Sequence, residues 1–328
     1  MRMAVVGVGH LGRWHAQKIR QIAGAELVGL CEPNAARAAE MEKEFSLACV
    51  SEAAQLPPID AAVIATPTSQ HAEIAAGLIR RGVHVLIEKP VVKTEADAQM
   101  LAALAADFPQ VVVQVGHIER FNPGVVAAQL VFARPSGLTF DRPWYMVAER
   151  LGPFKPRSLD VDVIDDLMIH DLDLALAWMG GEVSDVRAVG MSVMTHLVDM
   201  ANARIEFASG AVAQLTASRA SMESSRKLRL FTETRYLSLD LEKKEAKSVR
   251  RIKAAQNGGW PEIEGEPMVV ENHDALLVQA QAFVHACITK TAPQVTLQDG
   301  LRAVRLAWLV KEKMRTPGID ALERAGIR

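Results

Sequence analysis

Short apolar runs alternate with longer stretches of helical periodicity over the first third of the chain. The predicted strands are residues 3–8, 25–31, 60–65, 83–87 and 110–115, and the predicted helices between them are 11–22, 34–45, 69–81 and 94–106. Asn34, Ser69 and Thr94 are expected to cap the last three helices, because their side chains can accept a hydrogen bond from the first helical turn. This alternation predicts a doubly wound parallel sheet of the Rossmann type, with helices on both faces.

The pattern changes after residue 118, which predicts a domain boundary there. Residues 121–160 are irregular and contain several prolines, and an apolar helix is expected over 163–178. Runs of β-type composition follow at 182–194, 200–208, 210–218, 226–232 and 235–241, and helices are expected near 272–289 and 297–315. We therefore expect an α/β protein with a Rossmann domain over residues 1–118 and an α+β domain with a mostly antiparallel open sheet over 119–328.

Composition narrows the possible partners. Of the 328 residues, 49% are hydrophobic and 23% charged, as in a globular protein with a sizeable core. The net charge of −2 makes nucleic acid an unexpected partner. No apolar run approaches the ~20 residues of a membrane span, so no membrane association is expected. The three cysteines lack CxxC spacing, which indicates a reducing, cytoplasmic location without a disulfide framework or zinc ribbon.

A GxGxxG motif, GVGHLG over residues 7–12, follows the first predicted strand and opens the first predicted helix. Gly7 permits the tight turn, Gly9 lets a pyrophosphate approach the backbone, and Gly12 lets helix and strand pack closely. The helix N-terminus supplies N–H groups and a positive dipole for the phosphate. A generic glycine turn, another nucleotide or a flavin are the alternatives, but the order of strand, loop and helix favours a dinucleotide.

A carboxylate at the end of the second predicted strand bears on which dinucleotide binds. Glu32 lies twenty residues beyond Gly12, where it can accept hydrogen bonds from both adenosine ribose hydroxyls and repel a 2′-phosphate. NAD is therefore favoured, while Arg37 nearby keeps NADP as the less favoured alternative. Arg37 joins the expected cofactor-binding residues, as do His10 and Leu11 in the loop itself.

Polar residues follow two further predicted strands. The segment ATPTSQH, residues 65–71, ends one strand, and HVLIEKP, residues 84–90, contains the next. The carboxyl ends of parallel strands meet at the edge where open α/β sheets bind ligands. Pro90 restricts the backbone of Lys89 to an extended conformation, which fixes the position from which the Lys89 side chain extends. A surface lysine in a turn is the alternative reading.

A carboxylate and an imidazole lie four residues apart in the apolar helix expected over 163–178. Asp166 and His170 therefore share a helix face, where the carboxylate can orient the imidazole and raise its basicity. Oxidation of an alcohol needs a group to take the hydroxyl proton, and histidine suits that role. A surface Asp–His pair and a metal site are the alternatives, but no third ligand has suitable spacing, so no metal is expected.

The glycine loop, the ATPxxxH segment, the EKP motif and the DxxxH motif together resemble the glucose–fructose oxidoreductase, inositol dehydrogenase and rhizopine-catabolism (Gfo/Idh/MocA) family, over most of the chain. The resemblance implies that Lys89 of the EKP motif lies near the substrate and the nicotinamide. It also implies that Glu88, Thr66, Pro67 and His71 shape the nicotinamide side of the cofactor site.

The same resemblance implies the acid–base chemistry. His170 would transfer the proton, Asp166 would hold its orientation, and Lys89 would stabilise the developing alkoxide and position the sugar hydroxyl. The histidines outside these motifs are expected to be structural or exposed: His15, His84, His196, His273 and His285.

The runs GHIERFNP at 116–123, ERL at 149–151 and DVDVIDDLMIHD at 160–171 resemble the branch of the family that oxidises carbon 3 of UDP-N-acetylglucosamine (UDP-GlcNAc). That branch implies a partner aminotransferase and a 3-amino sugar for lipid A. The residues expected to bind substrate are Lys89, Arg120, Asn122, Arg150, Arg157 and His170. Alternatively, Arg120 pairs with a carboxylate and Asn122 starts the next helix.

Two other functions stay open at this point. The substrate could instead be an inositol, a free sugar or another nucleotide sugar, such as a uronic acid derivative. A sensor or regulatory subunit that binds a dinucleotide without chemistry is the second, although this sequence keeps both Lys89 and His170. The family commonly associates through the open sheet, which implies a homodimer or homotetramer.

Overall fold

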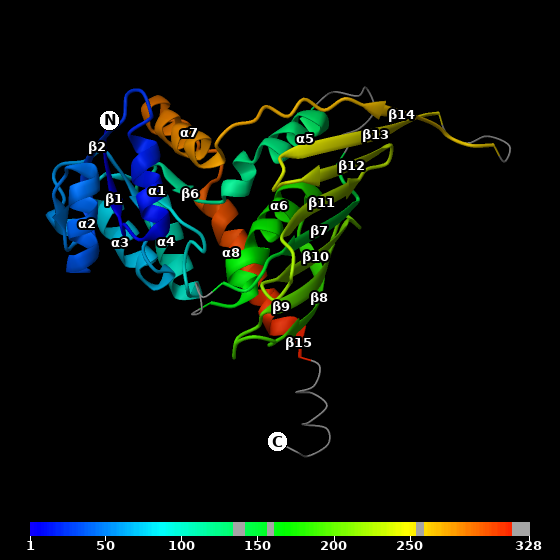
Figure 1. Cartoon of the computed structure of the whole chain (residues 1–328), viewed down its shortest axis with the longest axis horizontal. Helices are drawn as coiled ribbons and strands as arrows, with labels where there is room; N and C mark the ends of the chain where they lie inside the picture. The colour runs from blue at the N-terminus through cyan, green and yellow to red at the C-terminus, as the bar shows by residue number, and fades with distance from the viewer. Residues whose placement is uncertain (134–141, 156–160, 254–258, 317–328) are drawn as a thin grey trace, which may run out of the picture. The chain divides into compact units, whose positions relative to one another are not determined.

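The computed structural model describes residues 1–133, 142–155, 161–253 and 259–316. The chain forms two compact units: residues 1–121 with 274–304, and residues 122–273 with 305–328 (Figure 1). The chain leaves the first unit after Phe121, close to the boundary predicted after residue 118, and returns to it at Asp274. It leaves the first unit again after Val304, within helix α8 (Leu297–Lys313).

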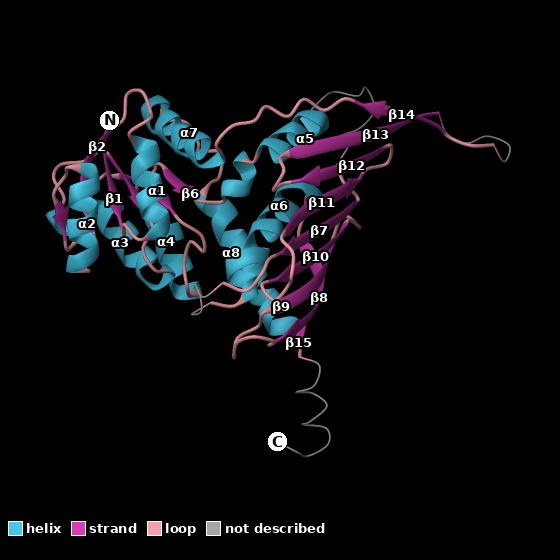
Figure 2. Ribbon diagram, viewed as in Figure 1, coloured by secondary structure: helices cyan, strands magenta, loops and turns pink. Residues whose placement is uncertain are grey.

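The described part of the first unit contains a six-stranded parallel sheet in the order β3-β2-β1-β4-β5-β6. Its strands are β1 Arg2–Val6, β2 Glu26–Cys31, β3 Cys49–Val50, β4 Ala61–Ile64, β5 His84–Ile87 and β6 Val113–Val115. The helices are α1 His10–Ile19, α2 Ala35–Phe45, α3 Thr68–Arg80, α4 Glu95–Asp107 and α7 Ala275–Thr289. Helices cover both faces of the sheet (Figure 2), which confirms the predicted doubly wound fold.

Helix α7 belongs to the first unit although it follows the second unit in sequence. Its buried Phe283 and Cys287 share one apolar cluster with Val5 of β1 and Ile19 of α1. Burying these side chains removes apolar area from water at about 25 cal/mol per Å². Packing on the sheet therefore decides the placement of residues 275–289.

The structure tests the three predicted helix caps. Asn34 accepts a hydrogen bond from the amide of Arg37 at 3.0 Å, and Thr94 accepts one from the amide of Asp97 at 3.1 Å. Both predicted caps are thus confirmed. The cap at Ser69 was wrong: α3 begins at Thr68, because Pro67 stands at the cap position with no side-chain hydrogen bond.

The described part of the second unit contains a nine-stranded sheet in the order β14-β13-β12-β11-β7-β10-β9-β8-β15. Its strands are β7 Tyr145–Leu151, β8 Val183–Met191, β9 Met200–Phe207, β10 Val212–Ser218, β11 Ser225–Phe231, β12 Arg235–Asp240, β13 Glu245–Lys253, β14 Glu262–Glu266 and β15 Met314–Arg315. The pairs β7–β10 and β8–β15 are parallel, and every other pair of described strands is antiparallel. The predicted mostly antiparallel sheet is confirmed.

Two elements lie in the region that sequence reasoning treated as irregular. Helix α5 spans Pro123–Ala133, and strand β7 spans Tyr145–Leu151 in the middle of the larger sheet. Along β7, buried and partly exposed positions alternate, so Met146, Ala148 and Arg150 face inward. Prolines near both elements hid this alternation, because a proline interrupts a periodic pattern whether or not it interrupts the element.

The helical side of the larger sheet carries the DxxxH motif. A π-turn, Ile164–Met168, runs directly into helix α6, Ile169–Met179. Asp162 begins this segment, and its side chain accepts hydrogen bonds from the amides of Ile164 and Asp165, both at 3.0 Å. Alternate strand residues such as Leu215 and Leu230 are fully buried on the inner face.

Candidate active site

The glycine loop between β1 and α1 has the geometry expected of a pyrophosphate cradle. Gly7 has a φ of +81°, and a Cβ at this position would lie 2.7 Å from the Thr66 backbone nitrogen. A Cβ on Gly12 would collide with the Gly7 carbonyl oxygen, so helix and loop approach too closely for any side chain. At Gly9, by contrast, a Cβ would meet nothing within 4 Å, which leaves open space over the backbone. The residues present therefore fit a bound dinucleotide.

A pocket of about 510 Å³ adjoins this loop at the carboxyl edge of the parallel sheet. Its lining includes Gly7 from the loop, Cys31 and Pro33 after β2, and Thr66 after β4. Ile74 and Leu78 of α3 add apolar surface. A mostly apolar cavity beside a phosphate cradle suits the adenosine half of a dinucleotide.

Glu32 and Arg37 brace the loop from the neighbouring strand and helix. One Glu32 carboxylate oxygen accepts a hydrogen bond from the Val8 amide at 3.2 Å, and the other accepts one from the Asn34 amide at 3.1 Å. The Arg37 guanidinium donates to the carbonyls of Val8 at 2.8 Å and Gly9 at 3.2 Å. Arg37 therefore stiffens the loop backbone, and Glu32 lies beside it at the end of β2.

The TPxxxH segment is tied to the EKP motif through His71. Its two ring nitrogens lie 2.8 Å from the Thr66 carbonyl oxygen and 2.9 Å from the Pro90 carbonyl oxygen. Burial lowers the pKa of His71, although the contacts with the two carbonyls oppose that shift. Because His71 lies 1% exposed and joins both loops, its visible role is to hold Thr66, Pro67 and the EKP turn together.

Glu88 makes a buried side-chain hydrogen bond that sequence reasoning missed. His15 of α1 lies with Nε2 at 2.7 Å from Glu88 Oε1, and the other carboxylate oxygen accepts from the Lys89 amide at 3.2 Å. Burial opposes ionisation of Glu88, but the His15 hydrogen bond and the charges of His15 and Lys89 outweigh it, so its pKa is lowered. Gly116 is required here, because its Cβ would lie 2.7 Å from Glu88 Oε1.

One sequence signal for His15 was available. It falls on the same helix face as Gly12, Ala16 and Ile19, which are the buried positions of α1. A histidine on the buried face of a helix that follows a glycine loop needs a polar partner. Which partner it takes depends on β5 and not on α1, so the spacing alone could not name Glu88. Lys89 follows immediately, partly buried, at a cis Lys89–Pro90 bond.

In the second unit, the DxxxH motif crosses the junction between the π-turn and α6. Asp166 lies in the π-turn and is partly buried, whereas His170 lies in the first turn of α6 and is buried, with 9% exposure. Single π-turns often occur at functional sites, because the wider turn re-aims side chains. Lys311 of α8 anchors the turn through Asp165, with Nζ to Oδ2 at 2.5 Å.

The residue after His170 is held by an arginine expected to bind substrate. Arg150 of β7 donates from Nε and Nη2 to the two carboxylate oxygens of Asp171, at 3.0 and 2.8 Å. Both side chains are 4% exposed. This bidentate pair fixes the first turn of α6 against the sheet. The geometry thus favours a positioning role for Arg150.

The remaining predicted substrate residues lie in different surroundings. Arg120 is buried in the short helix η2 (Ile118–Phe121), with Nη2 at 3.9 Å from Asp299 Oδ1. Asn122 donates to the Leu241 carbonyl at 3.0 Å and accepts from the Gly124 amide at 3.0 Å, so it caps α5, as its alternative reading expected. Arg157 lies outside the described residues.

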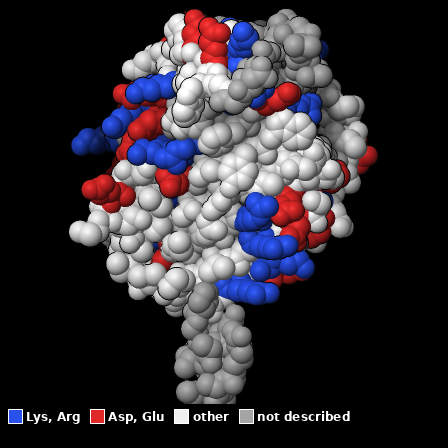
Figure 3. Space-filling view, turned by 90° about the vertical axis from the view of Figure 1, so that its right-hand side faces the viewer, with Lys and Arg blue, Asp and Glu red and all other residues white. Residues whose placement is uncertain are grey.

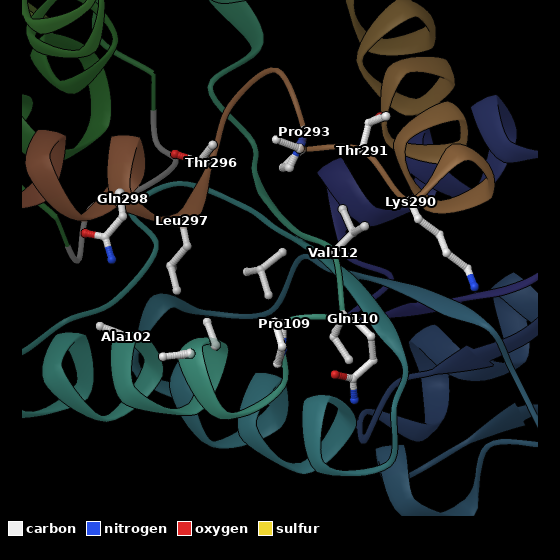
Figure 4. A pocket seen from close by; sticks show the side chains of 15 residues that line it. Ala102, Pro109, Gln110, Val112, Lys290, Thr291, Pro293, Thr296, Leu297 and Gln298 are labelled. Carbon is white, nitrogen blue, oxygen red and sulfur yellow. The ribbon is translucent and has the colours of Figure 1, made fainter.

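A second pocket of the first unit, about 480 Å³ in volume, is not part of these clusters. It lies between the end of α4 and the segment 290–298, where Gln110, Lys290 and Gln298 are its longest polar side chains (Figure 4). Lys290 is the one ionisable residue of this described lining, and no glycine-loop or EKP residue reaches it. Among the described residues of this lining, Lys290 is therefore the only group for acid–base chemistry.

Comparison with known proteins decides the family. Residues 1–117 match the model of the oxidoreductase family with an NAD-binding Rossmann fold, and residues 132–237 match the GFO/IDH/MocA C-terminal domain. The chain belongs to the Gfo/Idh/MocA oxidoreductase family. The glycine loop and the EKP motif fall in the first match, and the DxxxH motif falls in the second.

Among curated relatives, the UDP-N-acetylglucosamine 3-dehydrogenase of Acidithiobacillus ferrooxidans is 42% identical over 87% of this chain and 88% of its own length. Its solved structure matches with a TM-score of 0.86, at 37% identity, over 96% of this chain and 97% of that one. The NAD-dependent scyllo-inositol 2-dehydrogenase of Bacillus subtilis is 29% identical over 67% of this chain and 68% of its own. A scyllo-inositol dehydrogenase of Lactobacillus casei shares the fold, with a TM-score of 0.76 at 20% identity over 96% of each chain.

Within the described ranges, no helix combines the length and apolar character needed to cross a bilayer. Across the same residues, His, Cys, Asp and Glu side chains do not gather in groups of three or more that could hold a metal ion.

Proposed function

We propose that this protein oxidises the 3-hydroxyl of UDP-GlcNAc to the 3-keto sugar nucleotide, with NAD as hydride acceptor. The observation that carries the proposal is the 42% identity to the Acidithiobacillus ferrooxidans 3-dehydrogenase, which extends over 87% of the chain. The likeness to the scyllo-inositol 2-dehydrogenase is weaker, at 29% over 67%. If the chain shared only general family features, its identity to the two dehydrogenases would be similar.

The site residues supply the groups that the reaction needs. His170 accepts the proton of the 3-hydroxyl, and Asp166 orients the imidazole. The Lys89 ammonium stabilises the alkoxide as it develops. NAD held by the glycine loop would supply the hydride acceptor for carbon 3, so that the alcohol would become a ketone. The Arg150–Asp171 pair keeps the first turn of α6, and with it His170, in place.

The preference for NAD over NADP rests on Glu32. Its carboxylate lies at the end of β2, where the adenosine ribose of a dinucleotide would bind. At this position it would repel the 2′-phosphate of NADP. The nearby Arg37 guanidinium is engaged with the Val8 and Gly9 carbonyls and with Glu40 at 2.9 Å. These contacts support a structural role for Arg37, which leaves Glu32 to set the preference.

The ketone product indicates which class of reaction consumes it. A 3-keto sugar nucleotide is a substrate for an aminotransferase, and the resulting 3-amino sugar would serve lipid A synthesis. Such a partner would also draw an unfavourable oxidation forward.

NAD and sugar nucleotides are cytoplasmic metabolites. We propose that the enzyme works in the cytoplasm, where its free cysteines would stay reduced.

A substrate panel tests the proposal. We expect NADH formation, followed at 340 nm, to show the highest kcat/KM with UDP-GlcNAc, compared with myo-inositol, free N-acetylglucosamine and a UDP-uronate. A ketone trap, or an aminotransferase with its amine donor, should be present to pull the reaction. The same assay with NADP should give a lower kcat/KM than with NAD.

Either of two results would contradict the substrate assignment. A higher kcat/KM with myo-inositol or free N-acetylglucosamine would keep the oxidoreductase and discard the nucleotide sugar. Turnover of the UDP-uronate alone would keep the nucleotide and change the sugar. Product mass and the position of the carbonyl group, read by NMR, identify carbon 3.

We also propose that the protein forms a homodimer or homotetramer through the outer face of the larger sheet. On this face a band of uncharged side chains runs between groups of acidic and basic side chains (Figure 3). Phe231 of β11 packs against Tyr145 and Tyr236, with ring centroids 6.0 and 5.0 Å apart, and remains 39% exposed. Val189 of β8 is 40% exposed, so apolar area is spread across the sheet.

A charge placed on this face should separate the subunits. We expect Phe231→Lys to shift the mass measured by light scattering after gel filtration toward that of one chain, 35.7 kDa, because a buried lysine at an interface is unpaired. Met222→Lys is the matched control, since Met222 lies 98% exposed in the turn before β11. Equal masses for the two variants and the unmodified protein would contradict an interface at Phe231.

A further inference from the structure

A small polar pocket of about 80 Å³ lies in the second unit beside the DxxxH motif. Basic side chains dominate its lining. Four cations and one carboxylate line its described part, namely Arg150, Lys155, Arg219, Arg226 and Asp166. A pocket with this charge balance attracts an anion.

The sheet itself brings three of these arginines together. In the antiparallel pair β11–β7, Arg226 stands directly opposite Arg150. In the parallel pair β7–β10, Arg150 is the partner of Ala217, and Arg219 follows two residues later on the same side. Like charges opposite each other destabilise a sheet, so this arrangement needs anions to compensate it.

Two of the arginines are held in place by buried carboxylates. Arg150 forms its bidentate pair with Asp171. Arg219 donates from Nε to Asp199 Oδ1 at 2.7 Å, and the other Asp199 oxygen accepts three backbone N–H groups, from Val193, Met194 and Thr195. These contacts lower the pKa of Asp199 despite its burial, so the Asp199 carboxylate is ionised and holds Arg219 firmly.

Arg150 and Arg219 therefore form a rigid, charged wall, with 4% and 8% of their side chains exposed. Arg226 and Lys155 differ from them, because both are exposed at the mouth of the pocket. A ligand that enters from solvent meets these two side chains first. Exposed cations in front of a fixed wall of hydrogen-bond donors suit an anionic group with several oxygens.

The position of the pocket indicates which molecule brings the anion. Asp166 and Leu167 of the π-turn line it, and His170 follows Asp166 by four residues, about 6 Å along a helix axis. One sugar ring can bridge that span. An anion held here and a hydroxyl presented to His170 therefore belong to one substrate.

We propose that this pocket binds a phosphate group of a sugar nucleotide, with Arg226 and Lys155 as its direct ligands. Arg150 and Arg219, each held by a carboxylate, form the fixed wall behind them. This assignment rests on the proposed function and deepens it, because it names the residues that distinguish a nucleotide sugar from a neutral polyol. It also assigns to Arg226 and Lys155 the substrate contact that was expected of Arg150.

Binding of UDP to the full-length protein tests the assignment without catalysis. We expect Arg226→Gln and Lys155→Gln each to weaken UDP binding about tenfold or more in titration calorimetry, because each removes a charge-assisted contact. The KM for UDP-GlcNAc should rise by the same factor, while the Kd for NAD stays constant. Arg229→Gln is the matched control, since Arg229 lies on the same strand and faces Glu149 at 3.6 Å.

The outcomes separate this inference from the function on which it rests. Unchanged UDP binding and KM in both variants, with the unmodified protein still oxidising UDP-GlcNAc, would overturn the phosphate site and leave the function standing. An unmodified protein that neither binds UDP nor oxidises UDP-GlcNAc, but oxidises an inositol, would overturn both. Equal losses in Arg229→Gln would show a general charge effect and would also overturn the assignment.

Discussion

Replacing His170 by alanine should lower the rate of NADH formation from UDP-GlcNAc about 100- to 10,000-fold, the usual contribution of a general base. His170 is buried at the start of α6, directly after the π-turn that carries Asp166. Its loss removes the group that we propose accepts the hydroxyl proton and leaves the glycine loop untouched. The measurement is kcat at 340 nm, with the Kd for NADH followed by fluorescence.

A second histidine provides the control. His285 lies exposed on α7, and His285→Ala should leave both kcat and the Kd for NADH within about twofold. Activity in His170→Ala close to that of the unmodified protein would refute the proton-transfer role. If every variant, and the unmodified protein, binds NADH but turns over none of the panel substrates, the protein is a dinucleotide-binding regulator instead.

The second large effect is expected on stability. Arg150→Ala should lower the free energy of unfolding by about 3–5 kcal/mol, because it leaves the Asp171 carboxylate buried without its partner. Both side chains of this pair are 4% exposed, and the two hydrogen bonds measure 3.0 and 2.8 Å. Urea unfolding followed by circular dichroism measures the change.

A double variant distinguishes a broken ion pair from a lost substrate contact. Arg150→Met combined with Asp171→Leu removes both charges, so it should regain most of the stability lost in Arg150→Ala. If Arg150 acts mainly on substrate, Arg150→Ala should instead unfold at the same urea concentration as the unmodified protein and show only a raised KM. The same result would weaken the view that this pair positions His170.

The first unit was predictable because its signals are local. The glycine loop, the apolar strands and the caps Asn34 and Thr94 depend on residues within one strand, loop and helix. Their backbone conformations follow from short-range sterics and hydrogen bonds. The cap at Ser69 failed at the same scale, since Pro67 takes the cap position and starts α3 one residue earlier.

The second unit was less predictable for a physical reason. Strand β7 lies between β10 and β11, and it pairs parallel with one and antiparallel with the other. Those partners follow it by dozens of residues, so no pattern within residues 145–151 reveals them. Helix α7 similarly joins the parallel sheet only because Phe283 and Cys287 complete an apolar cluster around Val5.

The sequence by itself determined the α/β class, the dinucleotide loop and the motifs that carry Lys89, Asp166 and His170. Tertiary structure alone decided which buried polar side chains meet: His15 with Glu88, 73 positions apart, and Arg150 with Asp171. It also placed Arg226 opposite Arg150, near the start of β11 and the end of β7. A periodic pattern encodes the conformation of its own segment, whereas a buried charge takes its partner from whichever distant segment the packing of the core brings beside it.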